Sequence, residues 1–544
     1  MKYRFQNVRP NDEKAAYSGI EFYRGILIEK FSKIQYYDLW DLRTKRVISE
    51  AIVELNLVDR EINEKKDIIN TYNSAINHIA SLLLSEIEKY KKESLLSCLY
   101  TLAAYMFEMQ SYINLVGDER FTIEKIQQKA TFNQNEELIL MIADFVKSAG
   151  KEFYLNLSNG EDKAIIQHII LIATRCVHRG SKIISFNDLF KIFDLAASIV
   201  YLINDREMLT SEFNESLRVT SEGFELNEGK INENFYKIAY NLNECSTSLD
   251  SIIDRSTLEL LEDNLLKSLG FKLSTIKKMI KNEGSSGTTA ERYALVHLLP
   301  KKKLIELVQK EGICSKCEAE KIMEYFALKQ SDDKEVFKSF DKLSSRIFEN
   351  PILQYNDNFY LYSNTLMIAA HEILYNKLVY NLLPECWGDN STIIEEAIKK
   401  GFEKETYSLI SKYLNHSEYD VQDMEIVIDG VKRRIHLDKQ IDLWAMKEST
   451  LFIFECKDIC TKYTFTGFRN DIVKTKKFIF NLYEKVKEIT NKKLDIQTYL
   501  NCNISSIIPV LIFRNYNVSI HSEMNKRDII IIPFQNLENW LKNL

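Results

Sequence analysis

Three charged side chains stand in or beside strongly apolar segments of the sequence. Asp442 lies within segment 440–446, and Glu455 and Lys457 follow the apolar run 451–454. Charge in such surroundings costs free energy unless a partner or an ion compensates it. Because alternate residues of a strand share a face, Glu455 and Lys457 point the same way. A hairpin that pairs the two segments would bring Asp442 toward them, and a turn near residue 448 requires a bulge or bend before Asp442 can lie opposite Lys457.

Two carboxylates that converge on one point form an oxygen site suited to Mg²⁺, which takes one or two carboxylates and keeps waters for a substrate phosphate. Such an ion can lower the pKa of bound water, orient the phosphate and stabilise developing charge. A lysine two residues after the second acid can position the attacking water or neutralise the phosphate. The set therefore predicts phosphodiester hydrolysis. The competing interpretation is an ion pair of Glu455 with Lys457 at a strand end, with Asp442 as a cap or at the surface.

The elements that must position these residues form a compact α/β domain of about 150 residues, a common domain size. It begins near Ser391. Apolar periodicity and turn residues predict its elements. The expected helices are 392–414, 470–490 and 537–541, and the expected strands are 424–428, 432–437, 440–446, 450–457, 507–513 and 528–533.

Asp442 followed by Glu455-Cys456-Lys457 resembles the D…(D/E)xK signature of the PD-(D/E)xK nuclease superfamily, which has the restriction-endonuclease-like fold. The resemblance covers about the last 150 residues. That fold has an acidic helix before the strand pair, and the segment "GFEKETYSLI" (401–410) is similar to it. Two features depart from the family: Ile441 replaces the proline of many members, and a glutamine that some relatives carry has no clear counterpart. The number of metal ions and the substrate geometry therefore stay open.

The resemblance also implies a role for each site residue. Asp442 and Glu455 would bind Mg²⁺ or Mn²⁺, together with the backbone carbonyl of Cys456. Lys457 would assist the nucleophile. Glu403 would support the metal site directly or through water, and Glu405 is the alternative for that role.

Two basic clusters flank the motif. One is Lys432, Arg433 and Arg434, and the other is Lys474, Lys476 and Lys477. Phosphate-backbone contacts and ordinary solvated faces are equally good interpretations of both. Residues 391–544 hold 23 Lys and Arg against 21 Asp and Glu, a charge of +2 in a chain whose net charge is −6. The C-terminal part is thus better suited than the rest of the chain to bind a polyanion.

The whole chain of 544 residues is too long for one core and predicts an α+β multidomain protein. With only 16 Gly and 6 Pro, long helices are favoured. We expect a helical domain at 1–240, a second helical region at 241–390 with a hairpin at 352–362, and the nuclease-like domain at 391–544 with a central mixed sheet flanked by helices.

No signal peptide or membrane span is recognisable, which predicts a cytoplasmic protein. The nine scattered cysteines, including Cys314 and Cys317 of a CxxC pair, are expected to be free thiols.

These features favour a Mg²⁺-dependent endonuclease, with DNA preferred over RNA as substrate. A helical region fused to such a domain is similar in layout to bacterial antiphage or restriction effectors. The helical region would then sense, bind a protein partner or activator, or grip the substrate. A homo-oligomer is a further open alternative for the chain. The alternatives are a catalytically inactive scaffold that binds nucleic acid or protein, and an RNA-cutting effector with the same site.

Overall fold

The chain forms two compact units in the computed structural model. One unit comprises Met1–Glu228 with Leu265–Lys377, and the other comprises Gly229–Asn264 with Leu378–Leu544. The predicted middle region 241–390 is therefore divided between them. The structure describes residues 4–6, 10–32, 36–117, 138–144, 161–210, 216–226, 253, 255–286, 294–328, 346–428, 430–459, 465–515, 517–521 and 528–544.

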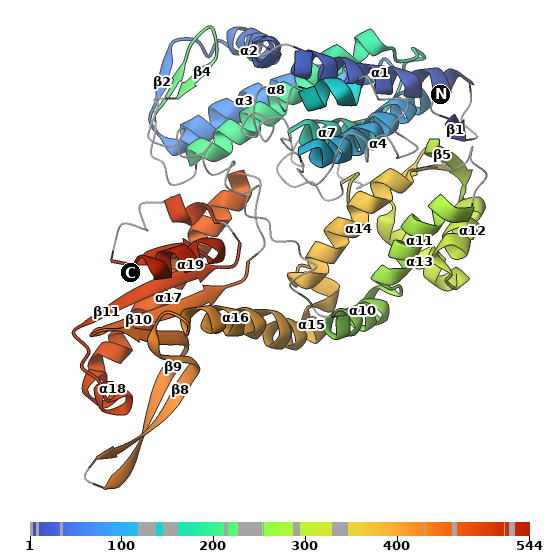
Figure 1. Cartoon of the computed structure of the whole chain (residues 1–544). Helices are drawn as coiled ribbons and strands as arrows, with labels where there is room; N and C mark the ends of the chain where they lie inside the picture. Colours follow the sequence, from blue (N-terminus) through green and yellow to red (C-terminus); the bar gives the residue numbers. More distant parts are fainter. Residues whose placement is uncertain are drawn as a thin grey trace. The chain divides into compact units, whose positions relative to one another are not determined.

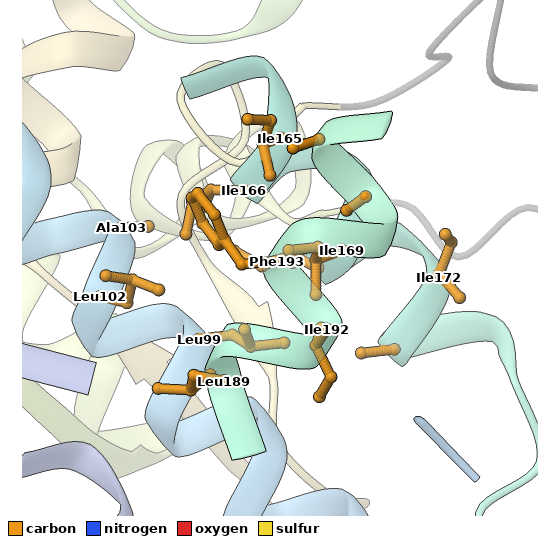
Figure 2. Close-up of a cluster of buried hydrophobic side chains, with 14 of the residues drawn as sticks. Leu99, Leu102, Ala103, Ile165, Ile166, Ile169, Ile172, Leu189, Ile192 and Phe193 are labelled. Carbon is orange, nitrogen blue, oxygen red and sulfur yellow. The ribbon is translucent and has the colours of Figure 1, made fainter. Parts of the chain in front are cut away.

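The first unit is mainly helical in its described part, as the sequence predicts. Figure 2 shows the core between three of its helices, where Leu99, Ile166 and Phe193 meet, all buried. None of the helices that the structure describes combines the length and apolarity of a membrane span. The helices include α1 (Pro10–Ser32), α2 (Tyr36–Glu54), α3 (Lys65–Ile87), α4 (Lys92–Gly117), α7 (Glu161–Arg175), α8 (Phe186–Thr210), α10 (Arg255–Leu269), α11 (Leu273–Ser286), α12 (Lys301–Gly312), α13 (Lys316–Phe326) and α14 (Asn364–Val379). The boundary between the units falls within α10 and within α14.

Two small sheets accompany these helices. One is antiparallel, in the order β2 (Arg60–Ile62), β3 (Leu217–Val219) and β4 (Phe224–Leu226). The other has the order β1 (Arg4–Gln6), β5 (Ala294–Pro300), β7 (Phe359–Tyr362) and β6 (Leu353–Gln354). Strands β6 and β7 are the predicted hairpin. The other five strands are not expected from the sequence: β1, β2, β3 and β4 have three residues each, and β5 pairs with strands that are distant in the chain.

The second unit is built on a five-stranded mixed sheet of order β12-β11-β10-β9-β8 (Figure 1). Strands β8 (Asn415–Ile428), β9 (Val431–Lys447) and β10 (Thr450–Lys457) form an antiparallel meander. Strands β11 (Ser506–Phe513) and β12 (Ile530–Pro533) then continue parallel to β10. This mixed sheet bears out the coarse α+β prediction and makes β10 its central strand.

Helices cover both faces of this sheet. On one face, α17 (Phe465–Asn491) and α18 (Lys493–Leu500) contribute Leu482, Ile489, Ile496 and Leu500 to a core with Leu451, Ile453, Leu511 and Phe513. On the other face, α16 (Lys400–Ile410) and α19 (Phe534–Lys542) contribute Phe402, Ile410, Leu537 and Leu541 to a core with Phe452, Phe454, Val510 and Ile512. The side chains of β10 alternate between the two cores, which explains why that strand is apolar throughout.

Several predicted elements differ from the structure. The predicted strands 432–437 and 440–446 are one strand, β9, and β8 begins nine residues before the predicted strand 424–428. The predicted helix 392–414 is α15 (Trp387–Ile393), a π-helix (Ile394–Lys399) and α16, and α18 was not predicted. The join in β9 has a physical cause: a Glu488 carboxylate accepts the backbone N–H groups of Asp438 and Lys439, at 2.7 and 3.3 Å, where the polar residues suggested a break.

Candidate active site at the end of the central strand

The two acids of the motif face each other across β9 and β10. The ladder between these strands pairs Leu443 with Phe454 and has no register shift, so its next step places Asp442 opposite Glu455. The backbone N–H of Cys456 donates to Asp442 Oδ2 at 2.9 Å. The bulge or bend expected from the sequence is therefore unnecessary, because Asp442 meets Glu455 rather than Lys457.

Lys457 completes this group from the same face of β10. Its Nζ lies 2.6 Å from Glu455 Oε1 and 3.7 Å from Asp442 Oδ2. It also lies 5.5 Å from the centre of the Phe478 ring of α17, within cation–π range. The three motif residues therefore do converge on one point, which answers the question raised by their apolar surroundings: each charge has a partner of opposite sign.

A fourth residue, Lys485, joins the group from α17 and was not predicted. Its Nζ donates to Asp442 Oδ1 at 3.0 Å and to Glu455 Oε2. Lys485 is 7% exposed and Glu455 is 5% exposed. One ammonium group thus bridges the two carboxylates inside the protein.

Lys485 lies on the face of α17 that is turned toward the sheet. That face is marked by buried residues at a spacing of four and three, among them Asp471, Thr475, Leu482 and Ile489. Lys485 is three residues after Leu482 and four before Ile489, so it occupies the same apolar stripe. A lysine within such a stripe was the signal in the sequence, but the many lysines of this helix obscured it.

The electrostatics of the group follow from burial and pairing. Burial alone would raise the pKa of Asp442, but Lys457, Lys485 and the Cys456 N–H outweigh it and lower that pKa. Burial would lower the pKa of Lys457, but Asp442 and Glu455 outweigh it and raise that pKa. The same two carboxylates raise the pKa of Lys485 against the effect of burial. The lysines and Asp442 are therefore charged at neutral pH.

The third predicted acid, Glu403, stands on α16 beside this group. Burial and then the negative charge of Asp442 raise the pKa of Glu403 to about 7. The alternative acid, Glu405, is instead held by Arg514 at 3.2 Å. Over the part of the chain that the structure describes, no three His, Cys, Asp or Glu side chains lie close enough to hold a metal ion. Direct ligation by Glu403 therefore has no support in this geometry, and an effect through water stays a prediction.

Arg514 links the helix of Glu403 to the ends of the central strands. Its backbone N–H donates to the carbonyl of Lys457 at 3.1 Å, and its guanidinium reaches the buried Asp458 at 3.3 Å. The guanidinium also lies 5.1 Å from the centre of the Phe402 ring. Burial raises the pKa of Asp458 to about 6, although Arg514 acts in the opposite direction. Arg514 thus holds the first turns of α16, at Phe402 and Glu405, near the end of β10.

The arrangement passes a simple fit test for a divalent cation. The Lys485 ammonium contacts one oxygen of each carboxylate at the same time, so a single cation position between Asp442 and Glu455 exists. Mg²⁺ and Mn²⁺ prefer such carboxylate oxygens, and two carboxylates with waters satisfy Mg²⁺. The fit is to these two side chains, and the predicted role of the Cys456 carbonyl stays a prediction.

The two basic clusters differ in their surroundings. Lys432, Arg433 and Arg434 are exposed on β9, toward the end of the long β8–β9 hairpin that continues beyond the other strands in Figure 1. Arg434 lies 2.9 Å from Asp423, and Lys432 lies 3.9 Å from Glu425, so this cluster is partly neutralised by β8. Arg434 also precedes Asp442 by eight positions in β9, which is about 26 Å in a regular strand. This cluster is therefore remote from the carboxylates.

The second cluster is nearer to them. Lys474, Lys476 and Lys477 are exposed on α17, in the two turns around Thr475 and Phe478. Phe478 contacts Lys457, as described above, and Lys474 lies one helical turn before Phe478 on the same side of α17, so Lys474 lies toward the same end of β10. Of the two clusters, the one on α17 is better placed to meet a phosphate that approaches the carboxylates.

Comparisons with protein-family models, with curated proteins and with solved structures found no match to this chain. The case for a function therefore rests on the residues and their geometry. Elsewhere in the chain, Cys314 and Cys317 are free thiols, as predicted, and burial raises the pKa of Cys314 to about 11.

Proposed function

We propose that the chain is a metal-dependent nuclease that hydrolyses phosphodiester bonds, with its active site at Asp442, Glu455 and Lys457. The observation that carries the proposal is the single buried cation position shared by the two carboxylates, with the Lys457 ammonium beside it. The mixed sheet, the acidic helix α16 and the order of the elements are consistent with the restriction-endonuclease-like fold that the motif resembles.

Each residue has a role that follows from its contacts. Asp442 and Glu455 would hold Mg²⁺ or Mn²⁺, which would supply a Lewis acid and a water of lowered pKa. Lys457, paired with Glu455 Oε1 at 2.6 Å, keeps its proton and would orient the attacking water or offset charge on the phosphate. Glu403, which stands on α16 close enough to Asp442 to be influenced by its charge, would support the metal site through water.

The proposed substrate is nucleic acid, with DNA favoured. Lys474, Lys476 and Lys477 would contact its phosphates, because they are exposed on α17 and Lys474 lies toward the end of β10 that carries the site. The proposed biological role, restriction or antiphage defence in the cytoplasm, rests on the layout of the chain alone. The helical first unit would carry recognition of a partner or activator.

One observation favours the alternative of an inactive scaffold. Two carboxylates and two lysines balance each other without an ion, because Lys485 already bridges the acids. A site neutralised in this way could persist as a structural ion cluster in a domain that binds nucleic acid or protein without cutting it.

The two functions are separated by a cleavage assay. Labelled duplex DNA, single-stranded DNA and RNA are incubated with the full chain in Mg²⁺, in Mn²⁺ or in EDTA. The nuclease predicts metal-dependent cutting of DNA that falls at least about 100-fold in Lys457→Ala. Lys404→Ala, an exposed lysine on α16, is the matched control and should cut like the wild type. Binding without cutting, unchanged in Lys457→Ala, would support the scaffold, and cutting of RNA alone would support the third alternative.

A further inference from the structure

We propose that Lys485 competes with the divalent ion for its carboxylate ligands and thereby sets the metal affinity of this site. The inference rests on the proposed function, which it deepens. It concerns a residue that lies outside the motif, 30 residues after Glu455 and on the helix that covers the sheet.

The four carboxylate oxygens are not equivalent. Asp442 Oδ2 accepts the Cys456 N–H at 2.9 Å and faces the Lys457 ammonium at 3.7 Å. Glu455 Oε1 is held by Lys457 at 2.6 Å. The remaining oxygens, Asp442 Oδ1 and Glu455 Oε2, are both bound by Lys485. The oxygens that an ion would share are therefore those that Lys485 holds.

An ion and this ammonium cannot occupy that position together. Both are cations, and each needs the same two oxygens at hydrogen-bonding or ligand distance. The charges of Asp442, Glu455, Lys457 and Lys485 also balance, with two carboxylates and two ammonium ions. Entry of a divalent ion next to an unmoved Lys485 would leave a buried excess of positive charge, which is costly. Binding of the ion therefore requires displacement of Lys485, while Lys457 can keep its own oxygen.

Displacement of Lys485 gives up two charge-assisted hydrogen bonds, so the wild-type chain binds the ion more weakly than its carboxylates alone would. Removal of the ammonium should raise the affinity for Mn²⁺ by about tenfold or more, since hydrogen bonds to charged groups are strong and site charge tunes affinity. Lys487, exposed on the same helix, provides a matched comparison because it lies two residues away and has the same side chain.

The test is calorimetric titration of Mn²⁺ into the full chain without nucleic acid. Lys485→Met is expected to bind about tenfold or more tightly than the wild type, Lys487→Met to bind like the wild type, and the double variant Lys485→Met/Asp442→Asn to lose the tight binding. Equal Mn²⁺ affinity of the wild type and Lys485→Met would overturn the inference, and so would a gain that does not depend on Asp442. Melting curves in EDTA establish that each variant is folded.

A second measurement keeps the wild-type sequence, in case Lys485→Met fails to fold. Amine-selective labelling read by mass spectrometry follows the reactivity of Lys485 as Mn²⁺ is added. Displacement predicts faster labelling of Lys485 with Mn²⁺ and no change at Lys487, whereas unchanged labelling at saturating Mn²⁺ would overturn the inference. Failure of the proposed function looks different: no substrate is cut, although Mn²⁺ still binds and still releases Lys485.

Discussion

The stability of the ion cluster gives the most quantitative test of the structure, through the substitution Asp442→Asn. The change keeps the shape of the side chain and removes its charge. Asp442 accepts hydrogen bonds from the Cys456 N–H at 2.9 Å and from Lys485 at 3.0 Å, and it faces Lys457 at 3.7 Å. The variant would leave the buried Lys485 ammonium and the half-buried Lys457 ammonium with one carboxylate between them.

The magnitude follows from these contacts. A hydrogen bond to a charged group contributes about 1.5–3 kcal/mol and a neutral one about 0.5–1.5 kcal/mol. The Asn amide has only one acceptor oxygen, so one of the two bonds becomes neutral and the other is lost, which together costs about 3 kcal/mol. Breaking a buried ion pair on one side costs about 3–5 kcal/mol. The two estimates agree near 3 kcal/mol, which for a unit of this size lowers Tm by about 6–12 °C.

The assay is urea unfolding in EDTA, with hydrogen exchange of the β9 and β10 peptides as the readout for the C-terminal sheet. Asp423→Asn is the control, because Asp423 also pairs with two basic residues, Arg434 at 2.9 Å and His436 at 2.8 Å, but at an exposed site. Exposed pairs contribute little, so the control should destabilise far less. An Asp442→Asn chain within about 0.5 kcal/mol of the wild type would refute the buried cluster.

Two further predictions concern the surroundings of the site. Glu403 has a pKa of about 7 in the folded chain, above the ordinary value of about 4.3, so its contribution makes stability fall as pH rises between these values. Glu403→Gln should therefore raise Tm at pH 8 but not at pH 4. Glu396→Gln, at an exposed position, is the control. Equal gains in Tm at both pH values would contradict the raised pKa of Glu403. Lys474→Ala should lower the salt dependence of DNA binding, measured by fluorescence anisotropy, by about one unit of slope. Arg434→Ala, already paired with Asp423, should lower it less, and the reverse order would place the phosphates on the hairpin.

The central strand could be predicted in full because its signals are local. An apolar run that ends in Glu455 and Lys457 and begins after a polar turn defines β10 as Thr450–Lys457, the bounds that the structure has. Period-two alternation also places those two charges on one face. The neighbouring strand could not be delimited in this way. Its polar stretch at Asp438 and Lys439 suggests a break, but the strand continues there, and Glu488, about 50 residues later, accepts the backbone N–H groups of both residues.

The sequence by itself determined the three motif residues, the order of the main elements and the mixture of helix and sheet, since these follow from residue type and short spacing. Only the tertiary structure decided that Asp442 faces Glu455, that Glu405 is engaged by Arg514, and that Lys485 bridges the two acids. These contacts join residues 13 to 109 positions apart in the chain. They depend on strand register and on where α17 packs along the sheet, and the packing of both cores fixes these.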